Sequence, residues 1–402
     1  MSPNLASTAV RVAVTAVVLV AVAIAIGPTP AGSDPAPSVD TATVTAETLS
    51  SERVPRTAET VLAGMSLRQR VGQLFMVGTP ATAASAATES HITRRHVGNV
   101  MLTGRSFGGV RTPARVSAAM QARTTLAATK RVRLLVATDQ EGGLVQVLNG
   151  PGLTDMPTAL TQGRWAPSRL RARAGLWARQ LRRAGVNMNL APVVDTVPSP
   201  SAAQANPPIG AFDRQFGFRP EVVATHGRAF VQGMSRNRVV PTIKHFPGLG
   251  RVHGNTDTSA GVTDRVTRRH DPYLRPFKAA IDAGSPFVMM STAYYARMDR
   301  RNPAAFSRFI IGQVLRGDLG FRGVVISDDL ASARQVSRWT YGQRAVKFVR
   351  AGGNVVLTVD PRTLPAMYSA VLTSAHARKS FRKKVDRSAL RILRLKEDRG
   401  LL

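Results

Sequence analysis

The chain has 402 residues, of which 44% are hydrophobic and 20% charged, and its mean hydropathy is -0.06. These proportions are typical of a globular protein, and they exclude a wholly disordered chain, a coiled coil and a membrane protein with many spans. Lys and Arg number 55 against 24 Asp and Glu, so the formal net charge is +31. An excess of this size is typical of proteins that meet nucleic acids, anionic envelope polymers or a membrane surface.

Arginine carries most of the positive charge, since eight of the 55 basic residues are Lys. The arginines are scattered along the chain, aromatic residues make up 5% of it, and no zinc-finger or basic-zipper spacing occurs. Because base stacking needs aromatic platforms, we do not expect nucleic acid as a partner. Electrostatic association with anionic polymers of the cell envelope is the expected role of the charge, although biased codon usage would also scatter arginine along a chain.

The N-terminus has the architecture of an export signal. Residues 12–26 are apolar except for Thr15, Arg11 precedes them, and a small, Pro-rich stretch follows. Fifteen residues fit the apolar region of a signal peptide, whereas a full membrane span needs about 20. We therefore predict that residues 1–33 are an export signal or an N-terminal membrane anchor in contact with the membrane, and that the protein is extracellular or associated with the cell envelope. No clean cleavage motif decides between the two.

Residues 34–50 are rich in Pro, Ala, Ser and Thr, which predicts a flexible linker. From residue 51 to residue 402 we expect a single domain. Its first helix is expected near residues 49–65, and eight short runs of β-branched and apolar residues follow, each bounded by Gly, Pro or a polar residue. The predicted strands are 71–78, 97–104, 134–139, 186–194, 239–246, 287–293, 324–328 and 354–360.

Segments with helical spacing lie between these strands. The predicted helices are 114–129, 169–184, 220–235, 305–315, 331–349 and 361–377, and a last one covers 388–396. Strands buried on both faces that alternate with helices indicate a parallel sheet, and eight of them indicate a closed (β/α)8 barrel of the TIM type. A doubly wound open sheet is the alternative, but the chain has no Gly-x-Gly-x-x-Gly after the first strand and no P-loop.

Reactive side chains stand at the ends of four predicted strands: Asp139, Asp195, Lys244 with His245, and Asp328. In a barrel of this kind the active site forms at the carboxyl ends of the strands. A single aspartate at a strand end more often caps a helix or binds a loop backbone. Four such ends on one face indicate a catalytic site.

Three chemistries fit such a set of residues. Asp139, Glu141, Asp195 and Asp328 are oxygen ligands that would suit a hard cation, but Lys244 beside them would repel it. Paired carboxylates together with basic groups suit glycoside hydrolysis. The lysine would also suit a Schiff base.

Five segments resemble glycoside hydrolase family 3, and in particular its single-domain β-N-acetylglucosaminidases of cell-wall recycling. They read DQEGG at 139–143, NLAPVVD at 189–195, DRQFG at 213–217, KHFPGLG at 244–250 and GVVISDDL at 323–330. The resemblance covers about residues 65–396 and implies that residues 51–402 are a family 3 barrel domain. It further implies a retaining exo-β-N-acetylglucosaminidase that acts on N-acetylglucosamine-containing glycans of the peptidoglycan type and needs neither metal nor cofactor.

The resemblance also assigns roles to residues. Asp328 matches the nucleophile that forms a covalent glycosyl-enzyme, and its neighbour Asp329 would support the turn. Hydroxyl-binding residues of the innermost sugar subsite are matched by Asp139, Arg214, Lys244 and His245. A lysine and a carboxylate can hold vicinal hydroxyls by charge-assisted hydrogen bonds. Asp195 is interpreted as support for the floor of the site.

The sequence departs from the family pattern after the fifth strand. The family has His where Leu249 stands, and an Asp-Ser-His triplet, which holds its acid/base dyad, where this chain has Asn255, Thr256 and Asp257. Two arginines usual after the third strand are replaced by Leu144 and Val147, so one substrate-binding arginine is missing. A β-glucosidase on the same scaffold and a catalytically weakened sugar-binding envelope protein are therefore the alternative functions.

The acid/base group is predicted on the loop after Lys244. Asp257 takes the position of the family histidine, and His253 is the second candidate on the same loop, with solvent as the third. Enclosure of Asp257 in a closed loop would raise its pKa, and Gly248, Gly250 and Gly254 would serve as hinges. A simple role for Asp257 in a loop turn is the competing interpretation.

Overall fold

A computed structural model describes residues 56–402, so the predicted signal segment 1–33 and linker 34–50 lie outside the described residues. Eight parallel strands form one sheet in the order β11-β9-β7-β6-β3-β2-β1-β12. A parallel bridge between Ile326 and Val355 joins its two edges, so the sheet is a nearly closed barrel. Its strands are β1 (Phe75–Pro80), β2 (Asn99–Thr103), β3 (Leu135–Thr138), β6 (Met188–Asn189), β7 (Val240–Phe246), β9 (Phe287–Met290), β11 (Val324–Ser327) and β12 (Val356–Thr358).

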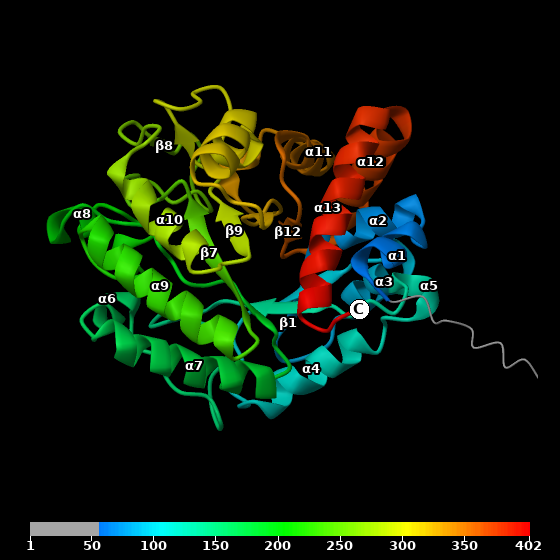
Figure 1. The fold of residues 1–402 in the computed structure, drawn as a ribbon, viewed down its shortest axis with the longest axis horizontal. Helices are drawn as coiled ribbons and strands as arrows, with labels where there is room; N and C mark the ends of the chain where they lie inside the picture. Colours follow the sequence, from blue (N-terminus) through cyan, green and yellow to red (C-terminus); the bar gives the residue numbers. More distant parts are fainter. Residues whose placement is uncertain (1–55) are drawn as a thin grey trace, which may run out of the picture. The chain divides into compact units, whose positions relative to one another are not determined.

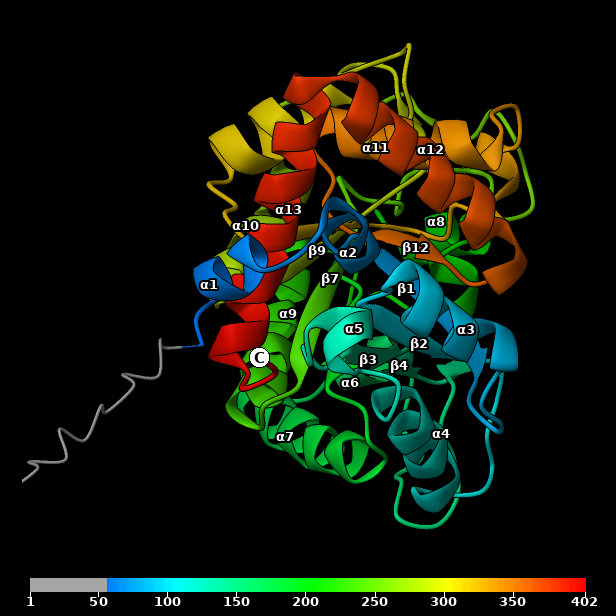
Figure 2. The same ribbon diagram turned by 90° about the vertical axis from the view of Figure 1, so that its right-hand side faces the viewer.

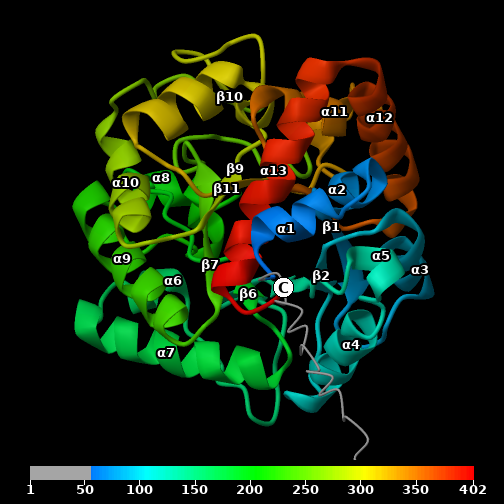
Figure 3. The same cartoon turned by 45° about the vertical axis from the view of Figure 1, so that its right-hand side comes forward.

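Helices surround this sheet in all three ribbon views (Figures 1, 2 and 3). The α-helices are α1 (Ala58–Ala63), α2 (Leu67–Gln73), α3 (Ala86–Arg95), α4 (Arg111–Gln121), α5 (Leu126–Thr129), α6 (Ala159–Gln162), α7 (Pro167–Arg183), α8 (Pro200–Gln204), α9 (Pro220–Arg236), α10 (Arg275–Asp282), α11 (Tyr341–Ala351), α12 (Leu364–Ala377) and α13 (Lys379–Asp398). Between β9 and β11 stands a π-helix, Ile310–Asp318. The predicted (β/α)8 barrel is confirmed, and no helix within residues 56–402 is long and apolar enough to cross a membrane.

All eight predicted strands are present, with different limits. The first one begins at Phe75 instead of residue 71, because Ser66 and Gln69 form a reciprocal capping box that starts α2 and carries the chain as helix to Gln73. Strand β6 is short because Pro192 has no N–H for the ladder, and pairing with β7 resumes where Val193 lies opposite Lys244.

Five α-helices were not predicted, namely α2, α3, α6, α8 and α10, and three predicted helices are divided, among them 114–129, which forms α4 and α5. The segment 305–315 is a short 3-10 turn followed by the π-helix, and the segment 331–349 begins with a loop and a 3-10 turn, so that α11 starts at Tyr341. Thr340 caps α11 through a second capping box with Gln343. The residues between β11 and α11 therefore form a loop at the carboxyl end of β11.

The core is a continuous apolar interior between the barrel and its helices. Aromatic rings pack between α7 and α9, with the ring centres of Trp177 and Phe230 6.1 Å apart and those of Phe216 and Phe230 6.3 Å apart. A Cβ atom on Gly233 would lie 2.4 Å from the carbonyl oxygen of Arg171, so a glycine is required where the two helices cross. This packing holds α7 and α9 together in the layer of helices around the barrel.

Helix α13 covers the end of the barrel where β1 and β2 begin. Its Lys396 is completely buried, and Nζ donates to Gln73 Oε1 (2.9 Å) and to the carbonyl oxygen of Gly98 (2.7 Å). Both partners are neutral, and burial lowers the pKa of Lys396 to about 7. Helix α13 also packs along α1, beside which it lies in Figures 1 and 3. With this end closed, the opposite end is left to the loops that follow the strands.

Two small sheets belong to those loops. The loop after β3 forms an antiparallel hairpin of β4 (Gln140–Gly142) and β5 (Val145–Gln146). In the loops after β7 and β9, β8 (Thr263–Asp264) pairs in parallel with β10 (Tyr294–Tyr295). Backbone pairing thus ties neighbouring loops together at the carboxyl ends of the strands.

Candidate active site

A cavity of about 360 Å³ lies at the carboxyl ends of the barrel strands. Six of the seven predicted site residues line it: Asp139, Arg214, Lys244, His245, Asp257 and Asp328. The seventh, His253, is exposed and is not among the lining residues. Apolar side chains complete the wall, among them Met101, Leu190, Met289 and Leu357. The barrel thus brings together predicted site residues that are up to 189 positions apart in the sequence, from Asp139 to Asp328.

Lys244 on β7 is the central cation of the cavity. Its side chain is 3% exposed, and Nζ lies 2.6 Å from a carboxylate oxygen of Asp139 and 2.6 Å from one of Glu141. Burial alone would lower the pKa of this lysine, but the two carboxylates outweigh it and hold the pKa above its usual value. Lys244 is therefore a protonated hydrogen-bond donor, and not the neutral amine that Schiff-base formation requires.

Glu141 joins the lysine to an arginine. Its two carboxylate oxygens accept from Nε (2.8 Å) and Nη2 (2.7 Å) of Arg214, which is the bidentate arrangement of a strong ion pair. Burial opposes ionisation of this carboxyl, but Arg214 and Lys244 lower its pKa to about 2. The sequence prediction did not include Glu141 in the sugar-binding set, although it stands within the DQEGG segment.

His245 is oriented from below by Asp195. Nδ1 of the imidazole lies 2.8 Å from Asp195 Oδ2, and Asp195 also accepts from the backbone N–H groups of His245 and Leu249. Because a carboxylate only accepts, Nδ1 is the donor and Nε2 is left for the cavity. Asp195 is fully buried, so it supports the floor of the site, as the sequence analysis interpreted it.

Asp328 and Asp329 follow β11 and differ in their contacts. The carboxylate of Asp328 accepts from the backbone N–H of Asp329 (2.9 Å), and no basic side chain within residues 56–402 pairs with it. Asp329 instead accepts from three backbone N–H groups, those of Ala331, Ser332 and Val359. Asp329 thus holds the turn, and Asp328 is left to face the cavity.

Asp257 reaches the cavity from the loop after β7. The residue as a whole is exposed, yet its carboxyl group lines the cavity and makes no hydrogen bond within the described part of the chain. Burial of the carboxyl, followed by the negative charge of Asp328, raises its pKa to about 6, against the opposing charges of His245 and Arg214. The turn here is made by another residue, since Asn255 Oδ1 accepts from the N–H of Asp257.

The loop that carries Asp257 is fastened to the loop after β11. The carbonyl oxygens of Thr256 and Asp257 accept from the N–H groups of Gln335 and Arg334, at 3.0 Å each. The buried side chain of Gln335 pairs with the backbone of Val262 in both directions, at 2.9 Å. The predicted hinge at Gly250 is a point of close packing, because a Cβ there would lie 1.9 Å from the carbonyl oxygen of Thr196.

The two positions where family members carry arginine offer no cation to the cavity. Leu144 is 62% exposed at the tip of the β4–β5 hairpin, and it is Val145 that lines the cavity. Arg105, from the loop after β2, donates to the carbonyl oxygens of Leu144 and Gln146 and so braces the hairpin from outside. Arg214, Lys244 and His245 are therefore the basic residues among the lining side chains.

The arrangement suits proton transfer and nucleophilic attack on a polyhydroxylated substrate. Three carboxyl groups without basic partners line the cavity, and that of Asp329 is taken up by three backbone N–H groups. The carboxyl groups of Asp257 and Asp328 are left to react, beside the paired charges of Asp139, Lys244 and Arg214. Within residues 56–402 no group of three His, Asp or Glu side chains is arranged to hold a metal ion, and Lys244 stands between the carboxylates that would have to bind one.

Comparisons with known proteins agree with this architecture. Residues 66–395 match the family described as glycosyl hydrolase family 3 N terminal domain. A β-hexosaminidase of Xanthomonas oryzae pv. oryzae is 35% identical over 305 residues, which are 74% of this chain and 87% of that protein. The crystal structure of a β-N-acetylhexosaminidase from Beutenbergia cavernae is 52% identical with a TM-score of 0.82, covering 83% of this chain and 99% of the other.

A family 3 β-N-acetylglucosaminidase from Paenibacillus sp. is 33% identical with a TM-score of 0.75, over 84% of this chain and 63% of that one. The match of the family description spans most of the chain and includes every residue that lines the cavity. The chain therefore belongs to glycoside hydrolase family 3 and is a glycoside hydrolase.

Proposed function

We propose that this protein is a retaining exo-β-N-acetylglucosaminidase that acts on peptidoglycan-type glycans through a covalent intermediate on Asp328. The observation that carries the proposal is the pair Asp328 and Asp257, two carboxyl groups without basic partners that line one cavity from two loops bonded to each other. The similar proteins named β-hexosaminidase and β-N-acetylhexosaminidase support the choice of sugar. The family resemblance supports retention of configuration.

In the proposed mechanism Asp328 attacks the anomeric carbon while Asp257 gives its proton to the leaving oxygen. The bond from carbon to the leaving oxygen breaks as the ester bond to Asp328 forms. Asp257, now a carboxylate, then takes a proton from water, which attacks the same carbon and releases Asp328. Asp139, Lys244 and Arg214 would bind the hydroxyl groups, since their charges are already mutually compensated and their remaining hydrogen-bonding capacity faces the cavity.

The first test is substrate preference. The proposed enzyme should hydrolyse a chromogenic β-N-acetylglucosaminide with a kcat/KM at least about tenfold higher than that for the matching β-glucoside, a difference of about 1.4 kcal/mol in the barrier. A preference for the glucoside would assign the protein to the β-glucosidase alternative. Binding of N-acetylglucosamine without turnover of either substrate would assign it to the weakened sugar-binding class.

Asp328→Asn should lower kcat/KM by roughly 10³-fold or more, because the amide cannot form the covalent bond on which the proposed mechanism rests. The rate is measured on the chromogenic N-acetylglucosaminide, and a fluorosugar that traps the intermediate should label Asp328 in mass spectra of the wild-type protein. Asp398→Asn, an exposed aspartate of α13, is the control for the loss of one negative charge. A label on any other residue would remove Asp328 from the nucleophile's role.

Asp257→Ala should cost far more rate on a sugar leaving group than on a nitrophenol, because only the poor leaving group needs a proton. Azide should restore turnover of the good substrate. With its pKa at about 6, Asp257 holds its proton below that pH, so wild-type hydrolysis of the poor substrate should fall as the pH rises through 6. His253→Ala is the matched control on the same loop. Equal losses on both substrates would exclude the altered residue as the general acid.

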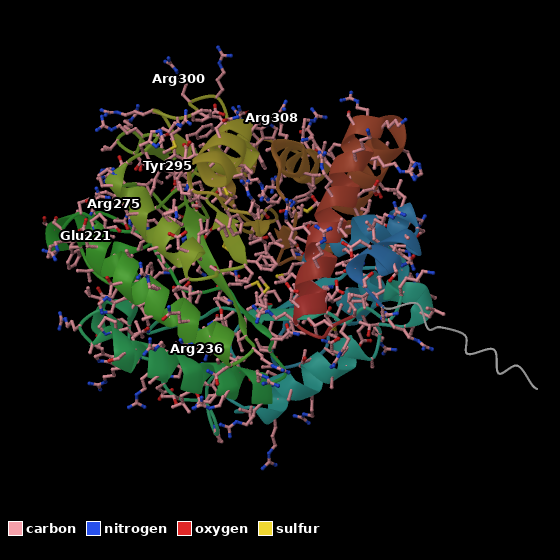
Figure 4. The ribbon with its side chains drawn as sticks, viewed as in Figure 1. Glu221, Arg236, Arg275, Tyr295, Arg300 and Arg308 are labelled. Carbon is pink, nitrogen blue, oxygen red and sulfur yellow. The ribbon has the colours of Figure 1, made fainter. Side chains whose placement is uncertain are left out.

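We also propose that the protein is exported and associates with anionic polymers of the cell envelope. Support for export comes from the apolar segment at residues 12–26. The net charge of +31 supports the association, and exposed arginines project from several elements around the barrel, as Arg236, Arg275 and Arg300 do in Figure 4. Of these three, Arg275 has an acidic partner, the exposed Glu221 at 3.2 Å.

The full chain should bind purified cell wall at low salt and be released as salt rises toward 1 M, where the screening length falls to about 3 Å. Retention is measured by co-sedimentation over a salt series, with wall stripped of its anionic polymers as the control. Binding that stays constant across the series would contradict the electrostatic account.

A further inference from the structure

A second depression lies on the same face of the barrel as the active site. Its volume is about 580 Å³, and three successive loops form it: the loop after β7, the loop after β9 and the loop after β11. Four arginines line it, together with Tyr294 and the buried Gln335: Arg265, Arg300, Arg301 and Arg338. None of the residues assigned above to sugar binding or catalysis contributes to it. This set of four is called the arginine rim below.

The arginine rim is exposed and has no acidic partner within residues 56–402. The two aspartates next to rim arginines in the sequence, Asp264 and Asp299, are engaged elsewhere. Asp264 accepts from the backbone N–H groups of Val266 and Thr267 and from the Thr267 hydroxyl. Asp299 accepts from the backbone of residues 301 and 302 and from the side chains of Asn302 and Ser307. The rim therefore presents uncompensated positive charge to solvent.

The depression adjoins the catalytic cavity through two short segments of chain. Gly261 in its wall is four residues from Asp257, and Gln335 is three residues from Ser332, which lines the catalytic cavity. Even a fully extended chain spans at most about 14 Å in four residues, so the two hollows lie within a few sugar lengths of each other. The hydrogen bonds of Gln335 to Val262 hold the wall between them in place.

We propose that the arginine rim is a subsite for carboxylate groups on the part of the glycan that leaves. This inference rests on the proposed function, in which an exo-acting enzyme holds the terminal sugar in the catalytic cavity and leaves the rest of the glycan on the surface beside Asp257. The leaving part of a peptidoglycan-type glycan carries carboxylates on its sugar and its peptide. The planar guanidinium fork of arginine matches a carboxylate with two parallel hydrogen bonds, and Tyr294 adds an aromatic surface for the sugar or peptide.

The rim favours substrates whose leaving part is negatively charged, and it does not alter the rate at which the glycosidic bond is broken once the substrate is bound. Exposed ion pairs are individually weak, so the rim arginines together are expected to shift binding by about tenfold. The rim therefore acts on KM for acidic substrates, whereas neutral substrates are handled by the catalytic cavity alone.

The test compares two disaccharides with terminal β-N-acetylglucosamine, one with a neutral reducing sugar and one whose reducing sugar carries a carboxylate side chain. In the triple variant Arg300→Gln, Arg301→Gln and Arg338→Gln, KM for the acidic disaccharide should rise about tenfold with kcat little changed. KM for the neutral disaccharide and for the chromogenic substrate should stay within twofold of the wild type. The matched control removes three exposed arginines of α7 and α9 in the variant Arg173→Gln, Arg182→Gln and Arg236→Gln, and it should behave as the wild type.

Two results would overturn the subsite: equal KM values for the acidic disaccharide in the two triple variants, or an equal rise for both disaccharides. Calorimetric binding of the acidic disaccharide to the Asp328→Asn protein, with and without the rim substitutions, gives a readout that needs no turnover. An inactive wild type would therefore contradict the proposed function while this measurement still decides the subsite. Binding that is unaffected by the rim substitutions would reject the subsite by itself.

Discussion

A lysine buried at the mouth of a barrel stays protonated only where negative charge surrounds it, because an uncompensated charge there would cost several kcal/mol. Lys244 meets this requirement with Asp139 and Glu141, and Glu141 in turn requires Arg214. The four groups carry two positive and two negative charges. Since β3 and β7 are not adjacent in the sheet and Arg214 comes from a loop, this network ties three parts of the chain together at the point where a sugar would bind.

Contacts between loops also fix the positions of the two proposed catalytic residues, Asp328 and Asp257. Asp328 stands at the end of a strand, and backbone bonds to residues 334 and 335 hold the loop that carries Asp257 at the same cavity. The buried amide of Gln335 closes this contact by pairing with both backbone groups of Val262. The loop after β7 is therefore positioned by the loop after β11, so the proposed nucleophile and the proposed acid/base are carried by two segments that pack against each other.

The barrel could be predicted from sequence because strands buried on both faces are apolar and carry polar residues near their carboxyl ends, as β7 does with Lys244 and His245. The limits of a strand were harder to predict where a helix cap or a proline determines them, as Ser66 does before β1 and Pro192 does after β6. The cavity residues at strand ends followed from the same rule. Glu141 did not, because alternation along a short hairpin does not show which of two nearby carboxylates turns toward an arginine 73 positions away. The backbone hydrogen bond between Asp257 and Arg334 could not be predicted either, because it joins two loops that are far apart in the sequence.

In the proposed mechanism Asp257 takes the acid/base role of the histidine that the resemblance places at this position. Its pKa of about 6 lies close to the value of about 6.5 for an ordinary imidazole, so both groups exchange protons in the same pH range. Part of that pKa comes from the negative charge of Asp328. In the proposed mechanism this charge disappears when Asp328 forms its ester, and the pKa of Asp257 then falls. The carboxyl group thus keeps its proton until the attack and is a carboxylate after it. A retaining glycosidase needs a general acid first and a general base second, in this order.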